Sequence, residues 1–155
     1  MLLASFLMNN YQDEALKGVG ESLLNNLHLM ILGYCYATEV ENYLFENYYT
    51  KSVDELYTDL NKIYASYGTS KLRKDYWFGP TLINTSYYSS YLTSAVESLQ
   101  LFEAAKTDFK AAKNKYISLI SDTQNLGEVD SWKKSGLASP FEASTIENIA
   151  KIFAK

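Results

Sequence analysis

The sequence is poor in residues that break helices and in residues that bind catalytic metals. Its 155 residues include only 2 prolines and 7 glycines. All-β proteins need many such residues at their turns, so this scarcity favours long helices. The chain has one histidine, His28, and one cysteine, Cys35. A catalytic zinc ion usually takes three protein ligands, and a two-histidine site such as H-E-x-x-H is excluded here.

The chain also lacks an excess of basic residues, a long apolar run and a second cysteine, which bears on its partners and its cellular compartment. The net charge is −4 at pH 7, whereas a nucleic-acid-binding domain normally carries a basic excess, so no nucleic-acid partner is expected. No apolar run approaches the ~20 residues that cross a bilayer, and the apolar start lacks a preceding basic region, so neither a membrane span nor a signal peptide is expected. One cysteine cannot form an intrachain disulfide. These features predict a cytoplasmic protein.

Apolar residues are abundant and recur with a helical period. Hydrophobic residues make up 47% of the chain, which suits a globular domain. Their spacing predicts an all-α fold, a single bundle-like domain of five to seven helices over residues 1–155. The first expected helix has its apolar positions at residues 2–7 and is ended by Asn9 and Asn10. Further helices are expected over residues 13–47, 52–67, 128–134 and 144–153. Residues 81–123 are expected to form either two helices that meet near 104–108 or one long bent helix. Three glycines inside the long second helix indicate close packing or a bend there: Gly18, Gly20 and Gly33.

Two helix starts carry the capping-box pattern, in which a serine and a glutamate three residues later each satisfy a backbone donor. Ser52 and Glu55 form the first pair, and Ser144 and Glu147 form the second. Gly68 is placed to end the helix that begins after Ser52. Residues 68–80 are expected to form a loop.

We expect no chemical role for the single histidine, the single cysteine or the acidic residues of the long second helix. His28 lies among apolar neighbours, so we expect a histidine that is satisfied locally inside a core. Cys35 lies in an apolar run and is expected to be a small buried thiol. The acids Glu39, Glu41 and Glu46 are the nearest to a carboxylate cluster. They lack a turn-rich cation-binding loop, and we expect them to face solvent.

The segment whose side chains could best support catalysis or ligand binding is residues 81–100, TLINTSYYSSYLTSAVESLQ. Tyr87 and Tyr91 are four residues apart, so one helical face presents two phenols, and Tyr88 lies one step round. Nearby serines would leave room in front of the hydroxyls. A phenol can donate a hydrogen bond to a developing oxyanion. The alternative is a tyrosine stripe that packs between helices.

At this segment the chain resembles the C-terminal part of oligoendopeptidase F, a zinc metallopeptidase related to thimet oligopeptidase. Residues 87–94 resemble the tyrosine-rich helix of that family. Further residues follow in the family's order up to a final amphipathic helix: Tyr116, Gly127, Trp132, Gly136 and Pro140. The helices expected upstream also have counterparts. The resemblance therefore extends over nearly the whole chain and depends on the order of several weak motifs.

The resemblance implies a role in peptide hydrolysis. It assigns Tyr87, Tyr88 and Tyr91 to contact with the oxyanion or the peptide, and it makes the chain one wall of a peptide-binding channel. The family's zinc and its H-E-x-x-H helix would belong to a segment upstream of Met1. This chain would then hold no cofactor and be inactive alone, with an oligopeptide and the zinc-bearing N-terminal part as partners. The histidine that the family has just after the position of Pro80 is absent.

Two other functions remain open on the same residues. The chain could be a stand-alone, non-catalytic module that binds peptides or proteins, with peptide affinity that depends on Tyr91. It could also be a purely structural helical domain whose tyrosines are all packed. A fragment of a larger protein should expose an apolar patch, which predicts self-association.

Overall fold

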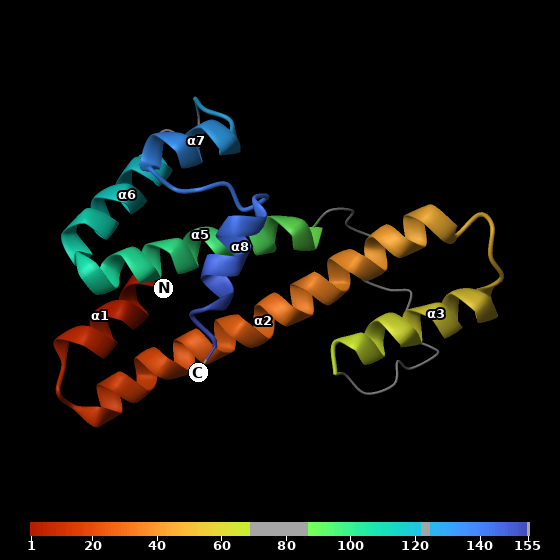
Figure 1. The fold of residues 1–155 in the computed structure, drawn as a ribbon, viewed down its shortest axis with the longest axis horizontal. Helices are drawn as coiled ribbons and strands as arrows, with labels where there is room; N and C mark the ends of the chain where they lie inside the picture. The colour runs from red at the N-terminus through yellow and green to blue at the C-terminus, as the bar shows by residue number, and fades with distance from the viewer. Residues whose placement is uncertain (69–86, 122–124, 155) are drawn as a thin grey trace. The chain divides into compact units, whose positions relative to one another are not determined.

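Helices make up all the regular structure that the computed structural model describes, which covers residues 1–68, 87–121 and 125–154 (Figure 1). Seven α-helices and no strand occur in these ranges, and this confirms the all-α prediction. None of the described helices combines the length and the apolar composition that crossing a bilayer requires. The helices are α1 (Leu2–Asn10), α2 (Glu14–Asn47), α3 (Val53–Ser66), α5 (Tyr87–Thr107), α6 (Phe109–Ser121), α7 (Glu128–Ser135) and α8 (Ala143–Ala150).

The chain divides into two compact units. The first comprises Met1–His28 and Thr93–Lys155, and the second comprises Leu29–Leu92. The boundaries fall inside α2 and α5, and each unit has a hydrophobic cluster of its own. The prediction of one domain over residues 1–155 stays a prediction.

The core of the first unit is built around a tryptophan. Trp132 on α7 is almost fully buried and packs with Leu101 and Leu137. Its indole N–H donates to the carboxylate of Glu97 on α5. Burial raises the pKa of Glu97, and the hydrogen bond from Trp132 partly offsets that shift. α6 and α7 lie side by side, which closes one side of this core (Figure 1).

A second contact of the first unit depends on a glycine. A Cβ atom at Gly20 on α2 would lie 2.6 Å from Cγ of Met8 and 2.9 Å from the carbonyl oxygen of Ala4, both on α1. Only glycine allows this approach without a shift of α1. The structure thus confirms close packing at Gly20, whereas Gly18 and Gly33 have open space around the same position.

The second unit contains a helical hairpin in which α3 runs back along the C-terminal half of α2 (Figure 1). Its buried cluster is Val40, Leu44, Leu56 and Leu60. The predicted capping box at the start of α3 is confirmed, since the Ser52 hydroxyl accepts from the Glu55 N–H and the Glu55 carboxylate accepts from the Ser52 N–H. After α3, Gly68 adopts a left-handed φ of 69°.

A charged network spans the same hairpin. The Lys51 ammonium lies 2.7 Å from the Asp59 carboxylate and 2.8 Å from the Tyr43 hydroxyl. The Tyr43 hydroxyl donates to Asp59 at 2.6 Å, and Lys62 adds an ion pair at 2.7 Å. These donors hold the pKa of Asp59 well below its usual range.

The second capping box is wrong. α8 begins at Ala143, with Glu142 at the position before it and no side-chain cap. The Glu142 carbonyl accepts from the Thr145 N–H at 3.0 Å, so the helix starts two residues earlier than Ser144 would place it. Helix α1 ends at Asn10, as the two asparagines at positions 9 and 10 predict. The predicted loop at 68–80 and the helix start at 81 lie, except for Gly68, outside the described residues.

Candidate functional site

The structure brings the three predicted tyrosines together with a fourth one in the second unit. Tyr34 on α2 stacks on Tyr91 with ring centroids 4.9 Å apart, and its ring lies 6.1 Å from that of Tyr88. Tyr87 contacts Tyr88 and Tyr91 edge to face, at 5.4 and 4.9 Å. We call these four residues the tyrosine cluster. The stacking partner holds the Tyr91 ring in place from the side of α2.

The outer edge of the tyrosine cluster is a pair of phenols. The hydroxyl oxygens of Tyr87 and Tyr91 lie 2.6 Å apart, so one donates to the other. The side chains are 45% and 39% exposed, which leaves the pair accessible. The hydrogen bond with Tyr87, followed by burial, raises the pKa of Tyr91, so this phenol is protonated at neutral pH. The accepting hydroxyl of the pair keeps its own proton for an external acceptor.

The cluster combines the two interpretations that the sequence left open. Tyr88 is half-buried between Tyr34 and Tyr87, as a packed tyrosine stripe requires. Tyr87 and Tyr91 are exposed, as a binding surface requires. Sequence reasoning missed Tyr34 because it lies on another helix, more than fifty residues away along the chain. No local pattern signals that contact.

His28 and Cys35 are less buried than expected. His28 is half-buried, and its ring stacks on Phe153 with centroids 4.2 Å apart. Cys35 is also half-buried, and burial together with the nearby Glu39 raises the pKa of its thiol. A raised pKa disfavours the thiolate, which is the nucleophilic form. This environment fits a structural cysteine.

The acids of α2 differ from one another. Glu41 is 5% exposed, so the prediction of a solvated side chain is wrong for it. It follows Val40 and lies three residues before Leu44, on the helix face that packs. Glu39 is exposed as predicted and accepts a hydrogen bond of 2.7 Å from Tyr67. Burial and this bond raise the pKa of Tyr67 to about 12.

A catalytic zinc ion usually takes three protein ligands drawn from histidine, cysteine and carboxylate side chains. The chain has one histidine and one cysteine, so three ligands from this chain would have to include at least one carboxylate. Within the described ranges, no group of three or more histidine, cysteine, aspartate or glutamate side chains is placed to hold a metal ion.

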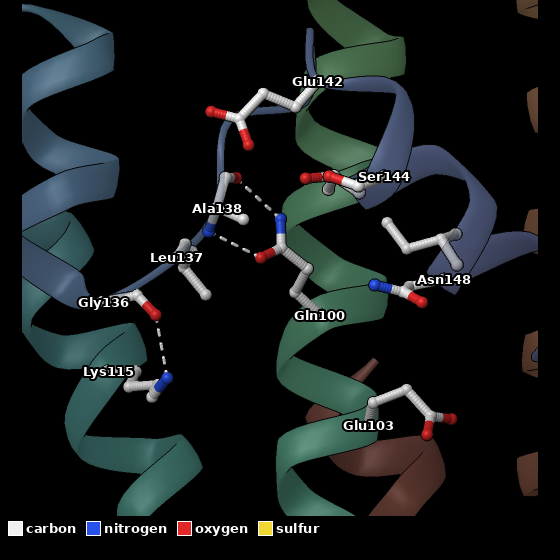
Figure 2. A pocket seen from close by; sticks show the side chains of 11 residues that line it. Gln100, Glu103, Lys115, Gly136, Leu137, Ala138, Glu142, Ser144 and Asn148 are labelled. Atoms are coloured by element: carbon white, nitrogen blue, oxygen red, sulfur yellow. Dashed lines mark hydrogen bonds between the residues drawn. The ribbon is translucent and has the colours of Figure 1, made fainter.

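The first unit contains a polar pocket of about 290 Å³ that sequence reasoning did not find. Residues from α5, α6, α8 and the turn after α7 line it (Figure 2). The Gln100 amide forms two hydrogen bonds with the backbone of Ala138, at 2.8 and 3.0 Å. The Lys115 ammonium donates to the carbonyl oxygen of Gly136 at 2.8 Å. These bonds fix the segment 136–138, which forms one side of the pocket.

Comparisons with known proteins give no match, whether with protein-family models, curated proteins or solved structures.

Proposed function

We propose that this chain is the C-terminal helical portion of an oligoendopeptidase F-like zinc metallopeptidase and forms one wall of its peptide-binding channel. The exposed phenol pair of Tyr87 and Tyr91 is the observation that carries this proposal. It supports the proposal because the resemblance assigns peptide contact to these residues, and their hydroxyls are within reach of a ligand. The zinc-bearing part would come from elsewhere in the parent protein.

The phenol pair suits the recognition of a peptide carbonyl. A peptide bond in an extended ligand offers a carbonyl oxygen that needs a hydrogen-bond donor. In the pair, one hydroxyl donates to the other, and the accepting hydroxyl keeps a proton that it can donate to a ligand. Acceptance of one hydrogen bond strengthens the donation of the next. The neutral phenols also carry no charge that would restrict the side chains of the peptide.

Tyr34 and Tyr88 hold the rings of the phenol pair in place. Tyr34 stacks on the Tyr91 ring, and Tyr88 fills the space between Tyr34 and Tyr87. A ring held between two neighbours loses little freedom when it binds a ligand, which lowers the entropic cost of binding. In the complete enzyme, such a donor could also stabilise the oxyanion of the reaction.

The parent protein is tested by the reading frame that encodes this chain. The proposal predicts an in-frame H-E-x-x-H segment upstream of Met1. A stop codon directly upstream would contradict it, and the alternative function, a stand-alone peptide-binding module, would take its place. The isolated chain is expected to leave a fluorogenic oligopeptide uncut with or without added zinc. Cleavage that a chelator abolishes would contradict the assignment of zinc to another segment.

Peptide binding is tested separately on the isolated chain. We expect an uncharged, unstructured oligopeptide to shift the NMR signals of Tyr34, Tyr87 and Tyr91 in a saturable way. Signals of Tyr116, an exposed tyrosine of the first unit, should stay in place and serve as the control. If no signal moves, the chain is a structural helical domain and the wall function is wrong.

A further inference from the structure

The phenol pair of Tyr87 and Tyr91 brings two oxidisable rings into contact. The hydroxyl oxygens lie 2.6 Å apart, and the ring centroids lie 4.9 Å apart. The ring carbons next to each hydroxyl, the ortho carbons, are the atoms at which phenoxyl radicals couple, and they flank this contact. Both side chains are exposed, so a small oxidant in solution can reach them. The two rings are therefore placed to react with each other once both have been oxidised.

The hydrogen bond between the phenols assists their oxidation. A phenol is neutral at pH 7, so it has to lose a proton together with an electron. In the pair, the accepting hydroxyl can receive that proton and release its own to solvent. The contact between the hydroxyls thus supplies a route for the proton.

The position of the pair on α5 favours a bond between these two rings. Residues four apart on a helix have Cβ atoms about 5–6 Å apart, which allows a link across one turn. Tyr87 is the first residue of α5, and helix ends fray, so the backbone there can adjust to a new bond. Tyr34 lies against the face of the Tyr91 ring, with the ring planes 27° apart, whereas Tyr87 meets Tyr91 at the hydroxyl edge.

Another pair of tyrosines in the second unit also lies close together but is less suited to coupling. The ring centroids of Tyr48 and Tyr49 are 3.8 Å apart. These residues are consecutive, so a bond between their rings would close a small cycle of atoms at a cost in bond-angle strain. The link between Tyr87 and Tyr91 closes a larger cycle that includes a full helical turn.

We propose that Tyr87 and Tyr91 form an oxidative modification site, at which a diffusible one-electron oxidant converts the pair into an intrachain dityrosine. Each phenol loses one electron and one proton, and the two phenoxyl radicals form a carbon–carbon bond between their ortho carbons. The hydrogens on these carbons are then lost as protons while the oxygens regain protons, which restores both phenols. In total, two electrons pass to the oxidant and two protons pass to solvent. This inference requires only the contact between the rings and does not depend on peptide binding.

Photo-oxidation of the full chain tests the site. A ruthenium tris-bipyridine complex is excited by light in the presence of persulfate, which accepts the two electrons and becomes two sulfate ions. At low protein concentration we expect a monomeric product with dityrosine fluorescence. Its tryptic peptide 75–106 should be lighter by two hydrogen atoms and should give no fragment ions from cleavage between positions 87 and 91. Dityrosine found only in dimers, or only in a product that joins this peptide to peptide 18–51, which contains Tyr34, would overturn the proposal.

Single substitutions assign the two ends of the link. Tyr87→Phe and Tyr91→Phe each remove one phenol and should abolish the loss of two hydrogen atoms from peptide 75–106. Tyr88→Phe, the same change at the half-buried tyrosine beside them, is the control and should leave the yield unchanged. Loss of the product in Tyr88→Phe, or its persistence in both Tyr87→Phe and Tyr91→Phe, would refute the pair. Failure of the chain to bind a peptide would not change these results, so this test is separate from that of the proposed function.

Discussion

The two units of the molecule use aromatic residues differently. Of the 14 tyrosines, only Tyr11 and Tyr116 lie outside residues 29–92. In the first unit, a tryptophan is almost fully buried with aliphatic partners. In the second unit, tyrosines lie at the edge of the core, and their hydroxyls bond to carboxylates, to an ammonium and to each other. A tyrosine can pack its ring against other side chains while its hydroxyl remains accessible to solvent. The second unit can therefore present hydrogen-bond donors on its surface without losing packing.

The largest expected effects on stability come from truncating one buried side chain in each hydrophobic cluster. Trp132→Ala in the first unit should lower the free energy of unfolding by about 3–5 kcal/mol, and Leu60→Ala in the second by about 2–5 kcal/mol, because both side chains are almost fully buried. Chemical denaturation of both single variants and the double variant measures this. Since the two clusters share no residue, the losses should add. A double variant that departs clearly from the sum would show that the two clusters are energetically coupled.

The next effect separates two glycines that lie two residues apart on α2. Gly20→Ala should destabilise the first unit by about 1–3 kcal/mol, because the added methyl group meets Met8 and the Ala4 carbonyl of α1. Gly18→Ala is the control, with open space around the same atom, and should stabilise the helix by up to about 1 kcal/mol. Thermal or urea unfolding gives both values. Effects of the same sign would contradict the contact between α1 and α2.

A smaller effect distinguishes the two serine–glutamate pairs. Ser52→Ala should cost about 1 kcal/mol of stability, because the hydroxyl caps α3. Ser144→Ala should change stability by less than about 0.5 kcal/mol, because this hydroxyl caps nothing. Urea titrations of the two variants compare them. A larger loss for Ser144→Ala would mean that α8 begins where the sequence pattern places it.

The smallest effect is a pH dependence in the second unit. The native pKa of Asp59 is lowered, so its network contributes stability above the ordinary aspartate pKa of about 3.9 and loses it as the pH falls through the native value. Asp59→Asn should therefore flatten part of the stability loss between about pH 5 and about pH 3. Asp54→Asn, an exposed acid on the same helix, is the control. An identical acid profile for the wild type and Asp59→Asn would contradict the network.

The parts of the fold that depend on neighbours in sequence could be predicted. The long helix α2 follows from its apolar content and from the lack of proline, and the cap of α3 follows from the Ser52–Glu55 spacing. The break between α5 and α6 was expected within residues 104–108, and it falls at Asp108. Gly136 ends α7 with a left-handed φ of 69°, as a glycine after a helix predicts.

Contacts between distant segments could not be predicted. Ser144 and Glu147 have the spacing of a capping box, but the backbone at Glu142 already turns into the helix, and tertiary packing places Thr145 and Ile149 inward. The helical spacing of Tyr87 and Tyr91 indicated a shared face, yet nothing local indicated Tyr34 as their neighbour. The polar pocket was missed for the same reason, because Gln100 and Ala138 meet only in the folded chain.

The proposed peptide surface is tested most directly by the peptide affinity of Tyr91→Phe. This change keeps the ring on Tyr34 and removes only the hydroxyl that bonds to Tyr87. Calorimetry with an uncharged oligopeptide should show an affinity about two- to tenfold lower than that of the wild type, the loss expected for one hydrogen bond. Tyr116→Phe, the same change at an exposed tyrosine of the first unit, should bind like the wild type. Equal affinities for the wild type and both variants would contradict a role for the phenol pair in peptide binding.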